Sequence, residues 1–226
     1  MSLPDPPEPS GADLAYAAGA AGASMVPIVG GAAVELVSAV FGPPLKRRQQ
    51  KWFEKLADVV RTLQERDIAV DEPEFVSAVA AASRIALGTH LEEKLTMLKA
   101  AIFHAAMPDR PADIMTMRFL RFVEELDPEH FVLLVFMRDP KGHFASNAIA
   151  EPNIAMGGLG SIYQQSGIAI ENLDLVRRDV TDRGLADGGS WNTMMTANGA
   201  WAPRTTDLGN QLLDFVTFID VEQPSE

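Results

Sequence analysis

The side chains that could carry acid–base or metal chemistry are scattered along this chain. Its four histidines are His90, His104, His130 and His143. No two of them lie three or four residues apart, and none belongs to an H-E-x-x-H motif, which places two zinc ligands and a general base on one helix. Cysteine is absent, which removes disulfides, thiolate metal sites and thiol nucleophiles. We therefore predict no metal site and a structural role for each histidine.

The glycine-rich stretch GGLGS at 157–161 is the segment most similar to a phosphate-binding loop. No β-strand is predicted before it and no Lys follows at the P-loop position, so we do not predict phosphate binding there. The nucleophile motif G-x-S-x-G is also missing. Paired acids at 92–93 and 124–125 fall on faces of helices that we expect to be solvated. The sequence thus predicts a protein that is not an enzyme, with no catalytic residues and no cofactor.

The amino-acid composition limits the classes of partner that this protein is expected to bind. Of 226 residues, 47% are hydrophobic and 22% are charged, which is typical of a globular protein, and the net charge is −12. An excess of acid disfavours general binding to nucleic acid, whose phosphates attract a positive surface. The first residues, MSLPDPPEPSGAD, lack the basic region of a secretory signal. We predict a cytoplasmic protein, with a peripheral or single-span inner-membrane location as the alternative.

Helical periodicity dominates the first half of the chain. Residues 45–66 repeat apolar side chains at helical spacing, in a stripe made of Leu45, Trp52, Phe53, Leu56, Val59, Val60 and Leu63. A further helix is predicted from about residue 73 to Gly88, and a capping box of Thr89 and Glu92 is predicted to start the next one. We expect residues 10–127 to form a helical bundle, with disordered tails at 1–9 and 221–226.

The face opposite the apolar stripe is basic, and it is our first candidate interaction surface. It carries Lys46, Arg47, Arg48, Lys51 and Lys55. Such a face can attract anionic lipid or remain solvated.

An uncharged run of 21 residues, Leu14–Val34, precedes this basic face. Its length permits a membrane span, but its many Ala, Gly and Pro residues supply little transfer energy. A packed helical hairpin, in which residues 36–41 contact Trp52 and Leu56, is the preferred interpretation. A conditional or peripheral membrane role and a permanent span stay open.

The sequence pattern of the second half of the chain differs from that of the first half. The dipeptide Asn198-Gly199 between two short strand-like runs predicts a tight β-hairpin at 192–204. Trp191 and Trp201 lie near Asn198-Gly199 and form our second candidate interaction surface. A helix that begins at a Thr/Asp cap follows.

This order of elements, at 128–220, resembles a winged-helix domain. The third predicted helix ends in RGLA, a hairpin follows, and a Thr-x-x-Gly step opens the last helix, with Leu185, Thr206 and Gly209 matching the pattern. The resemblance implies a third helix, at 171–186, that could read DNA. That helix alternates acids with its arginines, which is typical of a solvated face. Residues 10–127 look like bacterial proteins without an assigned function.

Together these patterns predict a mainly α-helical protein, with an N-terminal helical bundle at 10–127 and a winged-helix-like domain with a small β-hairpin at 128–220. We expect it to act through a protein partner or self-association, as an adaptor, regulator or scaffold. A membrane-associated effector that uses the Gly/Ala-rich segment and a transcription regulator are the two alternatives.

Liposome flotation separates the first two of these functions. The protein is expected to stay in the soluble fraction with anionic vesicles and to remain monodisperse without detergent. If it floats, and if replacing Lys46, Arg47, Arg48 and Lys51 by Gln abolishes flotation, the membrane effector replaces the soluble bundle.

Overall fold

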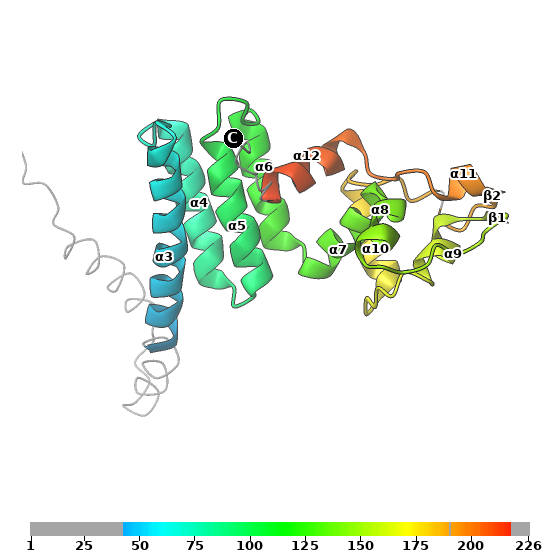
Figure 1. Ribbon diagram of the computed structural model, residues 1–226. Coiled ribbons are helices and arrows are strands. Elements are labelled where there is room, and N and C mark those ends of the chain that lie inside the picture. The colour runs from blue at the N-terminus through cyan, green and yellow to red at the C-terminus, as the bar shows by residue number, and fades with distance from the viewer. Residues whose placement is uncertain (1–42, 190, 218–226) are drawn as a thin grey trace, which may run out of the picture. The chain divides into compact units, whose positions relative to one another are not determined.

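The computed structural model describes residues 43–189 and 191–217 (Figure 1). Its internal contacts divide the chain into two compact units, 1–47 and 48–226. The second unit holds nearly all described residues, and it is described here by itself. It is mainly helical, with one two-stranded antiparallel sheet among the described residues. The expected packing of residues 14–41 lies outside the described residues, and the predicted domain boundary at 127–128 stays a prediction.

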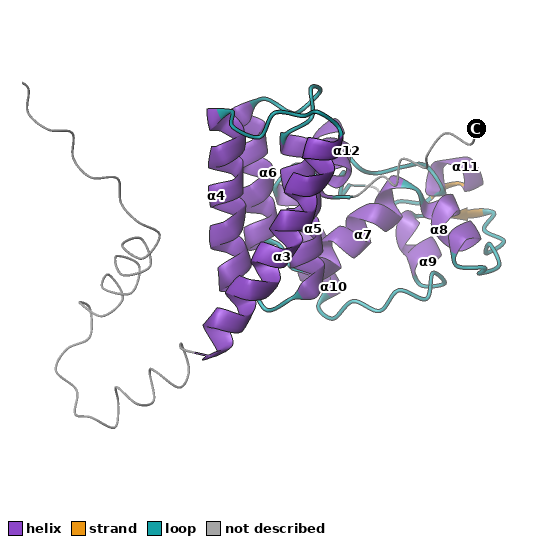
Figure 2. Cartoon of the chain, turned by 60° about the vertical axis from the view of Figure 1, so that its left-hand side comes forward, coloured by secondary structure: helices purple, strands orange, loops and turns teal. Residues whose placement is uncertain are grey.

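Four helices form the bundle of the second unit: α3 (Pro43–Glu65, whose first turn belongs to the first unit), α4 (Pro73–Gly88), α5 (Glu92–Ala105) and α6 (Asp113–Glu125). Helices α4, α5 and α6 contact one another pairwise (Figures 1 and 2). Helix α3 buries Trp52, Val59 and Leu63, and the indole nitrogen of Trp52 donates to Ser83 Oγ on α4 at 2.8 Å.

Two details of the bundle differ from the prediction. Phe53 is 58% exposed, because each helical residue turns by about 100° and Phe53 therefore points away from the face that buries Trp52. Thr89 does not form a capping box with Glu92. The residue before α5 is Leu91, whose amide donates to Thr89 Oγ1 at 3.2 Å, so the threonine stabilises the turn ahead of the helix.

Four short helices follow the bundle: α7 (Pro128–Arg138), α8 (Pro140–Ser146), α9 (Leu159–Tyr163) and α10 (Leu173–Asp182). Helix α8 follows α7 after one residue, Asp139. Pro140 occupies its first turn, and the Asp139 carboxylate accepts from the Gly142 amide at 2.9 Å. The proline and the preceding acidic cap stabilise the start of this seven-residue helix.

The predicted hairpin around Asn198-Gly199 is wrong. These residues lie in a one-turn helix, α11 (Ala197–Ala200), and neither has a positive φ. Strand β2 (Met195–Thr196) pairs with β1 (Met156–Gly157), about forty residues earlier in the chain. Thr196 caps α11 by accepting from the Gly199 amide, and Ala200 is fully buried. Burial and a local cap therefore outweigh the turn preference of the Asn-Gly dipeptide.

The last helix, α12 (Asp207–Val216), begins at the predicted Thr/Asp cap, with Thr206 Oγ1 accepting from the Gly209 amide at 3.1 Å. The same hydroxyl donates to the Gly184 carbonyl at 2.7 Å, and the Thr206 amide donates to the Leu185 carbonyl. An isolated antiparallel bridge joins Ala186 to Thr205. These contacts fix α12 to the end of α10.

One hydrophobic core runs through the second unit, from Trp52 of α3 to Val216 of α12. Helix α12 packs on α5 and α7, and α10 packs on α7. Across the described part of the chain, no helix combines the length and the apolar content that a bilayer crossing requires.

Gly209 gives a test of the α12 attachment. A Cβ at this position would collide with the backbone carbonyl of Leu185. Gly209→Ala is expected to lower the free energy of unfolding by roughly 2–3 kcal/mol, because packed backbone must shift to admit the methyl group. Denaturant unfolding measures the effect.

The matched control is Gly88→Ala at the end of α4, where an added Cβ meets no atom within 4 Å. That change is expected to alter the free energy of unfolding by less than about 1 kcal/mol. Equal effects of the two substitutions would contradict the close approach of α12 to Leu185.

Candidate functional site

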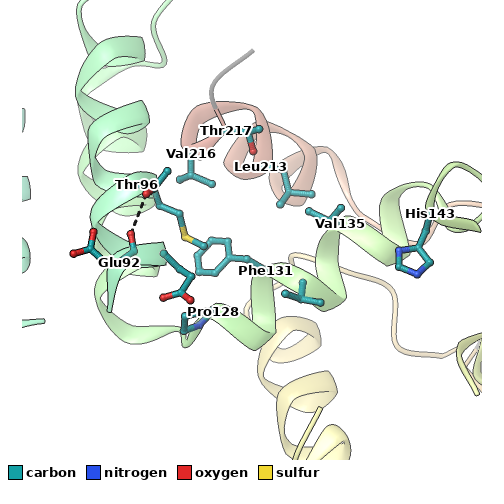
Figure 3. A pocket seen from close by; sticks show the side chains of 12 residues that line it. Glu92, Thr96, Pro128, Phe131, Val135, His143, Leu213, Val216 and Thr217 are labelled. Carbon is teal, nitrogen blue, oxygen red and sulfur yellow. Dashed lines mark hydrogen bonds between the residues drawn. The ribbon is translucent and has the colours of Figure 1, made fainter. Parts of the chain in front are cut away.

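An apolar groove of about 720 Å³ lies between α5, α7 and α12. Figure 3 shows Phe131 of α7 pointing toward α5, with Leu213 and Val216 of α12 bordering the same space. Met97 of α5 also lines it. The three helices come from distant parts of the sequence, so the groove exists only once α12 has packed.

Helix α7 supplies the open side of this groove. Val132 and Val135, almost one turn apart, line it and are 47% and 46% exposed. The helix sequence PEHFVLLVFMR is apolar on nearly every face. Phe131, Leu134 and their neighbours fill the core on one side, so the two valines are left on the other. Half-exposed apolar side chains that line a concave surface are typical of a binding site.

The carboxylates of Glu92 and Glu93 lie at one end of the groove. Glu92 Oε2 lies 3.3 Å from Lys55 Nζ, and Glu92 Oε1 lies 3.5 Å from Lys51 Nζ. The hydrogen bond from Lys55 holds the pKa of the Glu92 carboxyl below its ordinary value, partial burial opposes this shift, and Lys51 adds to it. The neighbouring Glu93 is exposed and forms no ion pair with any described residue. No Lys or Arg lines the groove.

His143 also borders the groove, but both of its ring nitrogens are engaged. Nε2 lies 3.0 Å from the Ser166 carbonyl oxygen and therefore donates to it. The Asn147 amide nitrogen lies 3.4 Å from Nδ1. The ring also packs edge-on against Phe136 and Phe144. His143 is thus a packing residue at the edge of the groove and has no free nitrogen for acid–base work.

The other histidines do not converge on a metal or catalytic site. His130 Nδ1 accepts from the Asp127 amide at 3.1 Å, and its Nε2 lies 3.3 Å from Asp179 Oδ2. His104 Nδ1 donates to the Phe215 carbonyl at 2.9 Å. Within residues 43–189 and 191–217, no three His, Asp or Glu side chains gather as metal ligands.

The first predicted interaction surface, the basic face of α3, lies outside this groove. Lys46, Arg47, Arg48 and Lys51 are exposed, and Lys55 is half-buried against Glu92. Their exposure agrees with a solvated or a binding face.

The second predicted surface needs correction. Trp191 is 7% exposed and packs on Tyr163, with Arg177 over its ring. Trp201 is half-buried and meets Phe144 edge-on. Burial against neighbouring rings explains why these two side chains do not form an exposed pair.

The burial of Trp191 explains the glycines of GGLGS. The Gly160 amide donates to the Trp191 carbonyl at 2.9 Å, and a Cβ on Gly158 or Gly160 would collide with Trp191. Two glycines here permit close backbone approach to a tryptophan. The stretch is therefore a packing motif.

Sequence reasoning missed the groove residues Val132 and Val135. The available signal was the apolar character of 128–138 on both helical faces, which is more than one buried face requires.

Comparison with known proteins adds no relative. No family model matches the chain, and neither curated proteins nor solved structures give a significant match. The groove is thus the basis for assigning a function.

The ion pairs at the groove end can be tested by titration. Carboxyl ¹³C NMR is expected to place the pKa of Glu92 below the ordinary glutamate value, and Lys55→Met should raise it toward that value. Lys51→Met should raise it less. Because the folded pKa is depressed, the stabilising effect of this contact is present above the ordinary pKa and is lost as pH falls through the folded pKa.

The control is Lys141→Met on α8, whose ammonium lies by Trp201. It should leave the pKa of Glu92 unchanged. A Glu92 titration that does not respond to Lys55→Met would contradict the contact between α3 and α5.

Proposed function

We propose that this protein acts through protein–protein contacts, as an adaptor, regulator or scaffold, by binding the apolar face of a partner helix in the groove between α5, α7 and α12. The observation that carries the proposal is the pair of half-exposed valines on α7, which line an apolar cavity of about 720 Å³. Helix-in-groove recognition uses apolar side chains at i, i+3, i+4 and i+7 of the partner.

The shape and lining of the groove support a helical occupant. Its walls are helices, and its floor includes Phe131 and Met97, which offer a large ring and an adaptable thioether. Thr96 uses its hydroxyl to bond the Glu92 carbonyl at 3.0 Å, so this polar group presents mainly its methyl to a ligand (Figure 3). The groove therefore favours a ligand that has an apolar surface and needs few hydrogen bonds.

The charge of the groove determines which partner helices it favours. The groove is lined by two glutamates and by no Lys or Arg. Glu92 is already neutralised by Lys51 and Lys55, whereas Glu93 has no cationic partner among the described residues. A partner helix with a Lys or Arg beside its apolar face would complement Glu93.

The winged-helix interpretation of residues 128–220 stays part of the proposal. The single bridge between Ala186 and Thr205 after α10 supports it, whereas the hairpin predicted as its wing is absent, because Asn198 and Gly199 lie in α11. Use of α10 for DNA is less well supported. Arg177 packs on Trp191 beside Asp174, and Arg183 pairs with Glu125 and Asp179. Of the three arginines in and directly after α10, only Arg178 lacks an ion pair with a described residue.

Binding of defined helical peptides tests the proposal. A labelled Leu/Lys amphipathic peptide of about four turns is expected to bind with a Kd on the order of 10 μM. Val132→Gln combined with Val135→Gln should weaken binding about tenfold, because two half-buried contacts together contribute roughly 1.4 kcal/mol. Fluorescence anisotropy measures both affinities.

The matched control is Val76→Gln on α4, which changes a slightly more exposed valine, at 53%, outside the groove. A Leu/Glu peptide should bind more weakly than the Leu/Lys peptide, and Glu93→Gln should narrow that difference. If the double variant binds the Leu/Lys peptide with unchanged affinity, or if Val76→Gln loses as much affinity, the peptide does not bind in the groove. Sedimentation that shows a dimer lost in the double variant would make a second copy the partner.

A further inference from the structure

A second cavity, of about 430 Å³, lies beside the opposite side of α12 and is chemically unlike the groove. Three rings line it: Phe103 and His104 of α5, and Phe215 of α12. Phe103 meets His104 edge-on with centroids 5.6 Å apart, and His104 lies 6.4 Å from Phe215. An aromatic lining of this kind favours a flat ligand that can pack on or against rings.

The orientation of His104 is fixed by the backbone. Because a carbonyl oxygen can only accept, the 2.9 Å contact between Nδ1 and the Phe215 carbonyl means that Nδ1 carries the proton. In the neutral ring, Nε2 is then a lone-pair acceptor without a described protein partner. A histidine held in this way can receive a hydrogen bond from a ligand hydroxyl.

Two arginines line the same cavity. The Arg66 guanidinium lies 5.1 Å from the centre of the Phe103 ring and forms no ion pair with a described carboxylate. Stacking on a ring holds a guanidinium in place while leaving its N–H donors free for a planar anion. Arg110 is already paired with Glu72 at 3.0 Å. Arg66 is therefore the cation available to a ligand.

The cavity also contains two acids, and they limit the charge of a ligand. Asp214 is neutralised by Arg138 at 2.7 Å, and Asp109 stands exposed on the loop before α6. A single negative group beside Arg66 is accommodated, whereas a ligand with several negative charges would meet Asp109.

We propose that this cavity binds a small aromatic monocarboxylate, with the carboxylate on Arg66, the ring among Phe103, His104 and Phe215, and a ring hydroxyl, where present, donating to His104 Nε2. This site shares no lining residue with the peptide groove, although α5 and α12 border both. A planar carboxylate matches the guanidinium fork in two parallel hydrogen bonds, and the rings supply the apolar contact.

The experiment titrates the full chain with 4-hydroxybenzoate and, separately, with its neutral analogue 4-hydroxybenzamide, followed by ¹H–¹⁵N NMR. Shifts from 4-hydroxybenzoate are expected at residues that line the cavity, with a Kd on the order of 1 mM for so small a ligand. The benzamide should bind at least about tenfold more weakly, because it lacks the charge-assisted contact. Arg66→Gln should weaken the binding of 4-hydroxybenzoate by a similar factor.

The matched control is Arg118→Gln on α6, because Arg118 is also exposed and also lies over a ring, that of Phe122 at 5.5 Å, outside the cavity. It should leave the Kd unchanged. Thermal melts establish that both variants are folded. Shifts absent at 10 mM ligand, equal affinity for the benzamide, or equal loss in the two arginine variants would each overturn the proposal.

Discussion

The packing of α12 against α5 and α7 is the constraint on which both cavities depend. The last helix of the described chain returns to a helix that ends about a hundred residues earlier. Its position is set at its start, where Thr206 bonds the Gly184 carbonyl and Gly209 lies against the Leu185 backbone. It is set again at its end, where the Phe215 carbonyl accepts from His104. A helix fixed at both ends can present two rigid faces.

Those faces carry different chemistry. Leu213 and Val216 border the apolar groove, whereas Asp214 and Phe215 border the aromatic cavity. Consecutive residues reach opposite sides because each helical step rotates by about 100°. Helix α5 is shared in the same way, since Met97 lines the groove and His104 lines the cavity. A change in the position of α12 would therefore alter both sites together.

The helices of the bundle and α12 were predictable because their signals are local. Periodic apolar residues, the proline at the start of α4 and the Thr/Asp cap of α12 act within a few residues of where they stand. The hairpin prediction failed because strand pairing is not local: Met195 pairs with Gly157. The surface role of Trp191 failed for the same reason, since its neighbours Gly158 and Gly160 are about thirty residues away.

The groove could not be predicted from the sequence because its walls come from three separate segments. The exposure of single apolar side chains does not identify it either. Ile114 is 80% exposed, more than any groove valine, yet it lines none of the described cavities. Val132 and Val135 are less exposed, but they continue a concave surface whose other walls are already apolar. A single exposed isoleucine is ordinary for a soluble surface, whereas apolar side chains that share one cavity can be buried together by one partner. The cooperative burial of that set is the physical reason to assign function to α7.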